Sequence, residues 1–249
     1  MNIINQIITI NGHNYKLVEM EQNISNLSST PILSLQYDFN DGNGPVPAHQ
    51  HVNPNGSKGG WVADTAKVEA MVYVWPSAAV FGNAQVYGHA LVSENARVYG
   101  DAQVYGSAQV FGDAQVSGDA LVSENARVYG DAQVYGHALV CGSALVYGHA
   151  QVSGYTQVFG SAQVYGHAQV SGDARVCERA QVYGNARVFG NARVFGHALV
   201  SGDARVSGDA QVSGSALVCG SALVYGSAQV SGNARVFGHA QVFGNEIWK

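Results

Sequence analysis

Residues 126–143 read ARVYGD, AQVYGH and ALVCGS, three consecutive hexads in which alanine, valine and glycine keep their places. Every sixth residue from Val62 to Val242 is valine, 31 times in succession and without an insertion. Alanine stands two residues before nearly every one of these valines from Ala66 onward, and Val72 and Thr156 are the exceptions. A period that is kept over most of the chain identifies a repeat architecture.

Each position of the hexad has a physical reason. Alanine and valine are two residues apart, so in an extended side Ala-x-Val both point inward, while the residue between them, mostly Gln, Arg or Leu, points outward. Glycine then supplies the backbone freedom for a sharp corner, and Asp, Asn, Ser or His at the sixth position supports that corner by local hydrogen bonding. An α-helix is excluded, because its period is 3.6 residues and each repeated glycine would destabilise it by about 1 kcal/mol.

Short strands between corners bury nothing by themselves, so they must wind into a coil whose turns stack on one another. Three six-residue sides make one triangular turn, and 31 hexads make about ten turns. At roughly 4.8 Å between stacked strands, the prism is expected to be about 50 Å long. The sequence therefore predicts an all-β fold, a parallel β-helix of about ten coils around a narrow core of alanine and valine.

The repeated valine with a small residue two positions before it resembles the bacterial transferase hexapeptide repeat, whose members form left-handed parallel β-helices. The resemblance covers residues 61–249 and supplies the handedness, because the general rule for parallel crossovers favours the right-handed connection. The residue after valine is often Tyr or Phe in this chain, whereas it is often small in that family. The resemblance thus implies a left-handed parallel β-helix with bulky corners.

The chain is expected to divide into a small N-terminal β cap over residues 1–60 and a hexapeptide-repeat β-helix over residues 61–249. Open ends of a β-helix expose unpaired strand edges, and natural solenoids cover them. Residues 3–10 alternate apolar and polar side chains, residues 11–14 read as a turn and residues 15–18 return, which predicts a β-hairpin. A third strand is predicted over residues 32–35.

The two ends of the coils carry further signals. Residues 38–41, a loop rich in Gly, Pro, Asn and His, and then the sequence GGWV at 59–62 resemble the leading segment of a group of bacterial and prophage hexapeptide-repeat proteins. At the opposite end, we expect the last residues to fold over the final coil or to meet another subunit, and the residues concerned are Phe243, Ile247 and Trp248.

Composition excludes several classes of function. The formal charge is −5 and the few Arg and Lys residues are scattered, so no basic patch is present for nucleic acid. Neither a secretory signal nor a run of about 18 apolar residues is apparent, so we expect a cytoplasmic protein with no membrane association. Cys141, Cys177 and Cys219 share one hexad position and are too far apart to pair, which predicts free thiols.

Reading every eighteenth residue predicts which side chains stack in neighbouring coils. One column holds five consecutive aromatic residues, Phe111, Tyr129, Tyr147, Tyr165 and Tyr183. Stacked rings stabilise the coils and also offer a flat amphipathic strip for protein or sugar contact. A second column holds glutamines flanked by arginines, and we expect the glutamines to hydrogen-bond from coil to coil; its members are Gln115, Gln133, Gln151 and Gln169, with Arg97, Arg187 and Arg205.

A third column holds Asp113, Asp131, His149 and His167, residue types that can hold a metal or support a proton transfer. Asn95 and Asn185 in the same column favour a generic polar corner instead. All repeat histidines interchange with Asp, Asn and Ser at the sixth position, which is typical of solvated corner residues, and a zinc enzyme of the γ-carbonic anhydrase type would need closely spaced histidines.

The cap holds a second pair of imidazoles. His49 and His51 lie on one side if the segment is extended, a spacing that some metal sites use. No Asp, Glu or Cys completes the set at a recognisable interval. We therefore expect neither a metal nor a cofactor.

The uninterrupted repeat bears most directly on function. Transferases of the resembled family interrupt their coils with a loop that carries a catalytic histidine and frames a cleft for an acylated cofactor between subunits. This chain has no interruption between Val62 and Val242, so no catalytic residue is carried over. We expect a non-enzymatic rigid scaffold or binding protein, acting through a face of the prism or a subunit junction, as a phage-encoded inhibitory or sequestering factor would.

Symmetric association is common for folds of this kind, so we expect a homo-oligomer, with a trimer as the first expectation. A protein or a small molecule is the expected partner, and nucleic acid is not. The alternative function is that of an acyltransferase of the hexapeptide-repeat type, with an acyl-CoA site between subunits and a corner histidine, His149 or His167, as its base.

Overall fold

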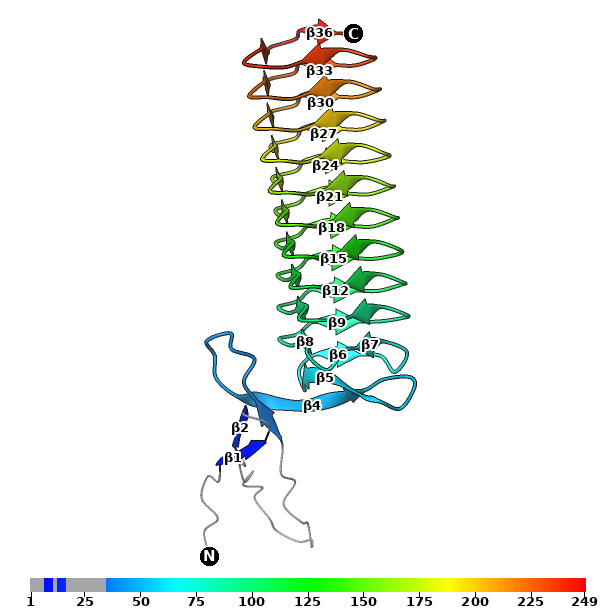
Figure 1. Ribbon diagram of the computed structural model, residues 1–249, viewed down its shortest axis with the longest axis vertical. Helices are drawn as coiled ribbons and strands as arrows, with labels where there is room; N and C mark the ends of the chain where they lie inside the picture. The colour runs from blue at the N-terminus through cyan, green and yellow to red at the C-terminus, as the bar shows by residue number, and fades with distance from the viewer. Residues whose placement is uncertain (1–6, 11–12, 17–34) are drawn as a thin grey trace, which may run out of the picture.

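The computed structural model describes residues 7–10, 13–16 and 35–249. It is an all-β protein in which triangular coils stack into a straight rod, with longer strands lying across the N-terminal end of the rod (Figure 1). About ten turns of the predicted left-handed parallel β-helix are present. The family resemblance and the period of the valines therefore gave the correct fold.

Three sheets form the three faces of the rod, and the strands of the stacked coils are parallel within each sheet. The strands of each face pair one coil apart, as Val110 pairs with Val128 and Val128 with Val146. The first face contains ten strands: β7 (Tyr73–Val74), β10 (Leu91–Val92), β13 (Gln109–Val110), β16 (Arg127–Val128), β19 (Leu145–Val146), β22 (Gln163–Val164), β25 (Gln181–Val182), β28 (Leu199–Val200), β31 (Leu217–Val218) and β34 (Arg235–Val236).

Among the described residues the second face contains thirteen strands, because the strands that cover the N-terminal end belong to it. In spatial order these are β3 (Gln36–Tyr37), β4 (Val46–Val52), β5 (Lys58–Ala63), β8 (Ala79–Val80), β11 (Arg97–Val98), β14 (Gln115–Val116), β17 (Gln133–Val134), β20 (Gln151–Val152), β23 (Gln169–Val170), β26 (Arg187–Val188), β29 (Arg205–Val206), β32 (Leu223–Val224) and β35 (Gln241–Val242).

The third face contains eleven strands. They are β6 (Lys67–Val68), β9 (Gln85–Val86), β12 (Gln103–Val104), β15 (Leu121–Val122), β18 (Leu139–Val140), β21 (Gln157–Val158), β24 (Arg175–Val176), β27 (Arg193–Val194), β30 (Gln211–Val212), β33 (Gln229–Val230) and β36 (Ile247–Trp248). The chain runs from the second face to the third, then to the first, and then begins the next coil. We call the corner after the first face the first corner, and name the other two corners in the same way.

The strands of the coils are shorter than the three-residue sides predicted from the hexad. Each consists of the outward residue and valine, and the alanine before them lies outside the strand. The reason is that alanine closes the preceding corner in many coils, as in the bond from Ala126 N to Ser123 O at 3.2 Å. Its carbonyl still joins the coils, since Gln109 N donates to Ala126 O at 2.9 Å.

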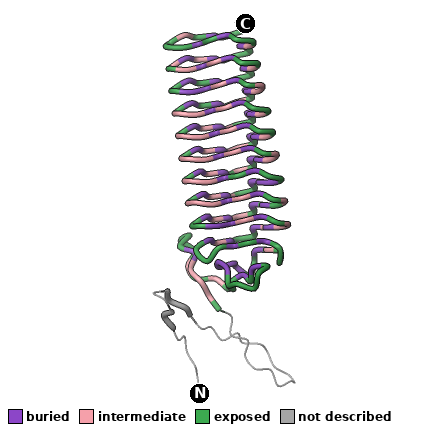
Figure 2. Tube along the Cα trace, turned by 45° about the vertical axis from the view of Figure 1, so that its right-hand side comes forward, coloured by how far each residue is buried: buried purple, intermediate pink, exposed green. Residues whose placement is uncertain are grey.

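The core is the narrow shaft predicted from the repeat (Figure 2). The valines from Val74 to Val242 and almost all of the alanines are inaccessible to solvent. Both exceptions to the alanine rule are also fully buried, and Thr156 satisfies its hydroxyl by donating to Ser153 O at 2.7 Å. Each buried valine contributes about 1.5–3 kcal/mol, so stability is spread evenly along the rod.

Glycine is required at the corners by both conformation and packing. Gly112 has φ 75°, in the left-handed region, and a Cβ added there would lie 2.8 Å from the backbone N of Gly130 in the next coil. Three glutamates occupy the same position with positive φ, Glu94 (57°), Glu124 (61°) and Glu178 (61°). Left-handed backbone costs about 1–2 kcal/mol per non-glycine residue, so these corners are strained.

The described parts of the N-terminal segment contain antiparallel strands, and its division as a separate cap domain stays a prediction. β1 (Ile7–Ile10) pairs antiparallel with β2 (His13–Lys16), and Ile10 lies opposite His13, so β2 begins inside the segment predicted as a turn. Residues 32–34 of the predicted third strand lie outside the described residues, and the next strand, β3, begins at Gln36. β3, β4 and β5 are antiparallel neighbours, and β5 then joins β8 in parallel as the first strand of the coils.

An aromatic cluster attaches these strands to the first coils. Trp61, Phe39 and Phe81 are buried together, and the ring of Tyr37 stacks on Trp61 with centroids 4.5 Å apart. Arg97 donates from Nη2 to the carbonyl of Phe39 at 2.6 Å. Within the described residues, no helix is long and apolar enough to cross a membrane.

Candidate functional site

The predicted aromatic column forms a continuous stack at the first corner. We call its five residues, Phe111, Tyr129, Tyr147, Tyr165 and Tyr183, the aromatic ladder. Successive ring centroids are 4.8, 4.8, 4.8 and 5.0 Å apart, and successive planes differ by 1–4°. All five rings are half-buried, because each follows a buried valine and leans along the outside of the corner.

Polar contacts link the aromatic ladder to the adjoining face. Tyr165 donates its hydroxyl hydrogen to Gln181 Oε1 in the next coil at 3.2 Å. The guanidinium of Arg127 lies over two rings, 5.2 Å from the centroid of Phe111 and 5.5 Å from that of Tyr129. Partial burial, together with the neighbouring tyrosines, raises the pKa of Tyr147 and of Tyr165 above its ordinary value. The strip therefore offers ring edges, hydroxyls and one cation.

The predicted Asp and His column lies beside the ladder at the same corner. His149 and His167 are exposed and stack with ring centroids 4.8 Å apart, and His149 Nδ1 lies 3.4 Å from Asp131 Oδ2. Asp113 instead accepts a hydrogen bond from Asn95 at 3.0 Å. No group of three or more His, Cys, Asp or Glu side chains in the described part of the chain is arranged to hold a metal ion. The geometry is that of a polar corner.

The other repeat histidines, His89, His137, His197 and His239, are also exposed at corners. His137 repeats the pattern seen at His149, since its Nδ1 lies 3.4 Å from Asp119 Oδ2 and its ring stacks on Tyr155 at 4.6 Å. Such contacts between neighbouring coils hold the corner side chains in place.

The predicted common side of His49 and His51 is wrong. The pairing of β4 with β5 shifts by one residue between Gln50 and Val52, and the two imidazoles take different environments. His49 is exposed and bonds Asp64 Oδ1 at 2.8 Å, whereas His51 is buried and its Nε2 contacts Val72 O at 2.9 Å. Asp64, which directly follows β5, gives His49 an acidic neighbour that the sequence close to the two histidines does not contain.

The predicted hydrogen bonds between glutamines of adjacent coils are also wrong. Gln115, Gln133, Gln151 and Gln169 do stack in register on the second face. No side-chain hydrogen bond joins one of these four to another, and Gln115 instead accepts from the hydroxyl of Tyr99 at 3.2 Å. The hydroxyl of a corner tyrosine reaches the side-chain amide of a glutamine in the next coil, so it competes with the stacked glutamines for that amide.

The C-terminal candidates are placed on the last coil. Ile247 and Trp248 form β36, which pairs with β33, so these residues continue the third face. Phe243 stacks on Tyr225 with centroids 5.5 Å apart, and the three side chains are 48, 59 and 38% exposed in the order Phe243, Ile247, Trp248. A contact of these residues with another subunit stays a prediction.

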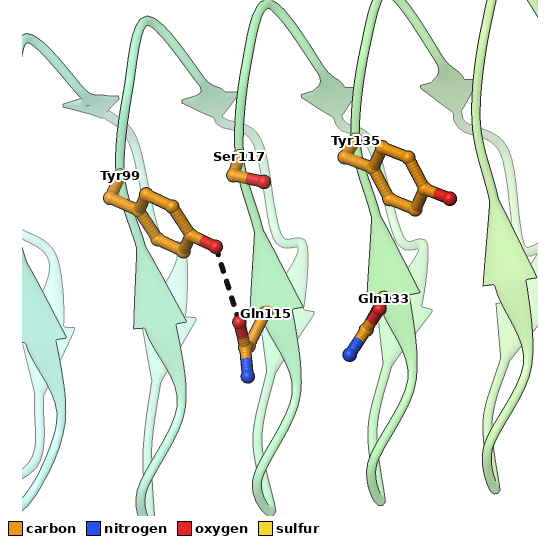
Figure 3. Close-up of a pocket in the computed structure, with 5 residues that line it drawn as sticks. All are labelled: Tyr99, Gln115, Ser117, Gln133 and Tyr135. Atoms are coloured by element: carbon orange, nitrogen blue, oxygen red, sulfur yellow. Dashed lines mark hydrogen bonds between the residues drawn. The ribbon is translucent and has the colours of Figure 1, made fainter. Parts of the chain in front are cut away.

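The sequence reading missed a second aromatic column, at the second corner. Counting by eighteen through Phe81, Tyr99, Ser117 and Tyr135 would have revealed it. Phe81 and Tyr99 stack at 4.9 Å with planes 3° apart, whereas the short side chain of Ser117 leaves a gap before Tyr135. A pocket of about 230 Å³ occupies this gap, and its lining residues are Tyr99, Gln115, Ser117, Gln133 and Tyr135 (Figure 3). We call it the aromatic slot.

The cysteines sit at corners, as predicted from their shared hexad position. Cys141, Cys177 and Cys219 are free and half-buried. Burial first, and then the charge of Glu124, raises the pKa of Cys141, and burial with Glu178 does the same for Cys177. A raised pKa leaves less thiolate, so these two thiols are poor nucleophiles.

Comparison with known proteins bears on the family. No curated protein matches the chain. A family model described as the YdcK Beta solenoid repeat matches residues 84–100, 96–112, 114–130, 132–148, 162–178, 180–196, 192–208, 198–214 and 228–244. These matches together cover more than half of the chain, and each spans nearly one coil. The chain therefore belongs to the YdcK beta-solenoid repeat family.

Proposed function

We propose that the protein is a rigid, non-enzymatic scaffold that binds a partner through the aromatic ladder. The observation that supports this most strongly is the combination of an unbroken solenoid with five parallel rings at one corner. From β5 to β36, all within the described residues, every connection is a tight corner and none is a protruding loop. A site that needs a mobile catalytic loop has no place to form.

Rigidity follows from the hydrogen bonding of the coils. Successive coils are joined on every face, as at Gln109 N to Ala126 O, Gln115 N to Ala132 O and Gln85 N to Ala102 O, each 2.9 Å. Because the shaft inside is filled with valine and alanine, a coil cannot bend without breaking these bonds or opening a void. A rod of this kind holds surface groups at fixed intervals, which is the property a scaffold needs.

The aromatic ladder has the composition of a binding surface. Tyrosine and arginine are the residue types that contribute most to protein interfaces, because they offer large contact area with a polar end. Here Tyr129, Tyr147 and Arg127 combine these features on one strip. The rings are already ordered by stacking, so binding would cost little side-chain entropy.

The partner that best fits the ladder is a second copy of this chain. The rings recur at steps of 4.8–5.0 Å along the rod, and another rod of the same repeat carries side chains at the same step. Two or three rods lying side by side would therefore keep their contacts in register over several coils. Closed association of this type gives the trimer expected for such folds.

The test is the solution mass of the protein, measured by sedimentation or light scattering. The wild-type chain should have a multiple of its 26.1 kDa mass, and the variant Tyr129→Ser, Tyr147→Ser and Tyr165→Ser should be monomeric. Serine already occupies this column at Ser201, so the variant should fold. The matched control is Tyr87→Ser, Tyr105→Ser and Phe159→Ser at the third corner, which should keep the wild-type mass.

Two outcomes would overturn the proposal. One is a wild-type protein that stays monomeric at high concentration, and the other is a ladder variant that keeps the wild-type mass. Thermal melting with acetyl-coenzyme A tests the non-enzymatic part separately. A ligand-dependent rise in melting temperature that is lost in His149→Asn and His167→Asn would support an acyltransferase instead.

A further inference from the structure

We propose that the aromatic slot binds the ring of a neutral pyranose whose hydroxyl groups are equatorial. The aromatic slot lies at the second corner, whereas the aromatic ladder lies at the first corner. The inference rests on the contacts of the slot itself and does not depend on the proposed function.

The slot has the dimensions of one missing ring. Phe39, Phe81 and Tyr99 are stacked with successive centroids 4.7 and 4.9 Å apart, and this stack ends where Ser117 replaces an aromatic residue. Tyr135 resumes the column one coil later, so Tyr99 and Tyr135 are separated by two coil steps, about 9.5 Å. In Figure 3 the rings of Tyr99 and Tyr135 lie on either side of Ser117 and point the same way. A ring over Ser117 would meet both tyrosines at the normal stacking distance.

The volume of the slot is suited to enclosing a single ring. The slot measures about 230 Å³, whereas sites for drug-sized ligands occupy roughly 300–1,000 Å³. A nucleotide or an acylated cofactor is therefore too large to be enclosed. One six-membered ring fits, with its substituents directed toward the floor and toward solvent.

The lining chemistry favours a polyhydroxylated ring over an aromatic one. Each of the five lining side chains is neutral, and each both donates and accepts hydrogen bonds. Within the described part of the chain, the side chains of Ser117, Gln133 and Tyr135 make no hydrogen bond to protein, so they remain available to a ligand. Sugar hydroxyls would pair with these groups, whereas an aromatic hydrocarbon ring has no hydroxyl to offer them.

The two tyrosine walls select the configuration of the sugar. The negative face of a tyrosine ring attracts C–H hydrogens, and a pyranose presents C–H hydrogens on both faces only if its hydroxyls are equatorial. An axial hydroxyl would point into the ring of Tyr99 or Tyr135. The slot should therefore accept the gluco configuration and reject the galacto configuration.

One wall is fixed before any ligand arrives. Tyr99 is held by stacking on Phe81, by the hydrogen bond from its hydroxyl to Gln115 Oε1 at 3.2 Å, and by Arg97, whose guanidinium carbon lies 5.8 Å from the ring centroid. Preorganisation of this kind reduces the entropy cost of binding. The fixed position of Tyr99 distinguishes the slot from an ordinary gap between flexible side chains.

The test uses methyl β-D-glucopyranoside and methyl β-D-galactopyranoside as probes in saturation-transfer NMR on the full chain. Wild-type protein should transfer saturation to the ring C–H protons of the glucoside and at least several-fold less to those of the galactoside. Ser117→Tyr fills the slot with the residue that the column uses elsewhere and should abolish the signal. Ser117→Ala leaves the slot open but removes one hydroxyl, so it should weaken the signal without abolishing it.

A matched control lies in the same column. Ser207 also separates two aromatic residues, Phe189 and Tyr225, but Arg205 and Leu223 replace the glutamines there. Ser207→Tyr should leave glucoside binding unchanged. If circular dichroism shows that Ser117→Tyr does not fold, Tyr99→Ala replaces it in the test. This variant removes one wall of the slot and should abolish glucoside binding.

Three results would overturn the proposal. The first is the absence of saturation transfer to the glucoside with wild-type protein. The second is a glucoside signal that survives both Ser117→Tyr and Tyr99→Ala. The third is equal transfer to the two probes, since that would show that the tyrosine walls do not sandwich the ring.

Discussion

Tyr129 and Tyr147 are separated by 18 residues of chain, yet their ring centroids lie 4.8 Å apart and their planes differ by only 1°. This distance matches the spacing between neighbouring strands, about 4.7–4.9 Å. The backbone therefore places the residues of one column directly over one another, and in the ladder the rings keep that spacing. Register alone is not sufficient, because Tyr87 and Tyr105 of the third corner are also one coil apart and form no ring pair among the described residues, and the hydroxyl of Tyr87 bonds Gln85 instead.

We expect the middle of the ladder to contribute to stability. Tyr147 takes part in two ring pairs, and each such pair is worth about 0.5–1.5 kcal/mol beyond area burial. Tyr147→Ala should therefore lower the free energy of unfolding by about 1–3 kcal/mol. Tyr147→Phe keeps both ring pairs and should stay close to wild type. Urea unfolding followed by circular dichroism measures both.

A control for this prediction is Tyr105→Ala at the third corner. The exposure of Tyr105 is 37%, and no ring pair involving it is found in the described part of the chain. A loss of stability in Tyr105→Ala as large as in Tyr147→Ala would show that bulk at the corner, rather than stacking, provides the effect.

We expect stability to rise when glycine replaces a strained corner residue, and to fall when a larger residue replaces a corner glycine. Glu124 has φ 61°, so Glu124→Gly should relieve left-handed strain and raise stability by about 0.5–1 kcal/mol after the entropy cost of glycine. Gly130→Ala should lower stability, because φ there is 70° and a Cβ would lie 3.1 Å from the N of Gly148. Thermal melts of the two variants provide the comparison, and a melting temperature of Glu124→Gly below wild type would contradict the strain.

Most of this fold was predictable because a single local rule is repeated. The inward valines, the alanines and the corner glycines each have one role, and the 18-residue register then assigns every neighbour. The aromatic ladder and the stacked pair His149 and His167 followed from the same counting. Handedness was different, because no residue of the hexad states it and only the family resemblance supplied it.

What could not be predicted depends on contacts outside the repeat or on choices between equal partners. The pairing at His51 shifts because β5 uses one residue more from Trp61 to Lys58 than β4 uses from Gln50 to Val52, and this contact lies outside the repeat. The spacing of His49 and His51 was therefore misleading. The glutamines had two hydrogen-bonding partners within reach, and the hydroxyl of Tyr99 prevailed at Gln115. The aromatic slot is created by the absence of a ring at Ser117, which a search for residues that are present does not notice.

We expect the half-buried thiols of Cys141 and Cys177 to react slowly, and each to respond to the charge of its own glutamate neighbour. The pKa of Cys141 and that of Cys177 are both raised, first by burial and then by Glu124 and Glu178, respectively. Alkylation by iodoacetamide at pH 8.5 should therefore be slower in the folded protein than in the urea-unfolded chain. Glu124→Gln should speed alkylation of Cys141 without affecting Cys177, and Glu178→Gln should do the reverse. Peptide mass spectrometry follows each thiol, and equal effects on both thiols would rule out these pairings.

The final prediction concerns alkaline pH. Burial, followed by the neighbouring tyrosines, raises the pKa of Tyr147 and Tyr165 in the folded state. In the unfolded chain tyrosine ionises near its ordinary pKa of about 10. The stability linked to these groups is therefore fully present below pH 10 and is lost as the pH rises through the raised folded-state pKa, because the unfolded state releases its protons first.

The variant Tyr147→Phe with Tyr165→Phe isolates this contribution. It cannot ionise at either position and keeps the stacked rings, so its urea midpoint should fall less than that of the wild type between pH 8 and pH 11. At pH 8 the two proteins should have similar midpoints, since both tyrosines are protonated in either state. If the urea midpoints of the two proteins fell equally between pH 8 and pH 11, ionisation of the ladder tyrosines would not oppose folding. The stack would then have to tolerate a phenolate between its rings.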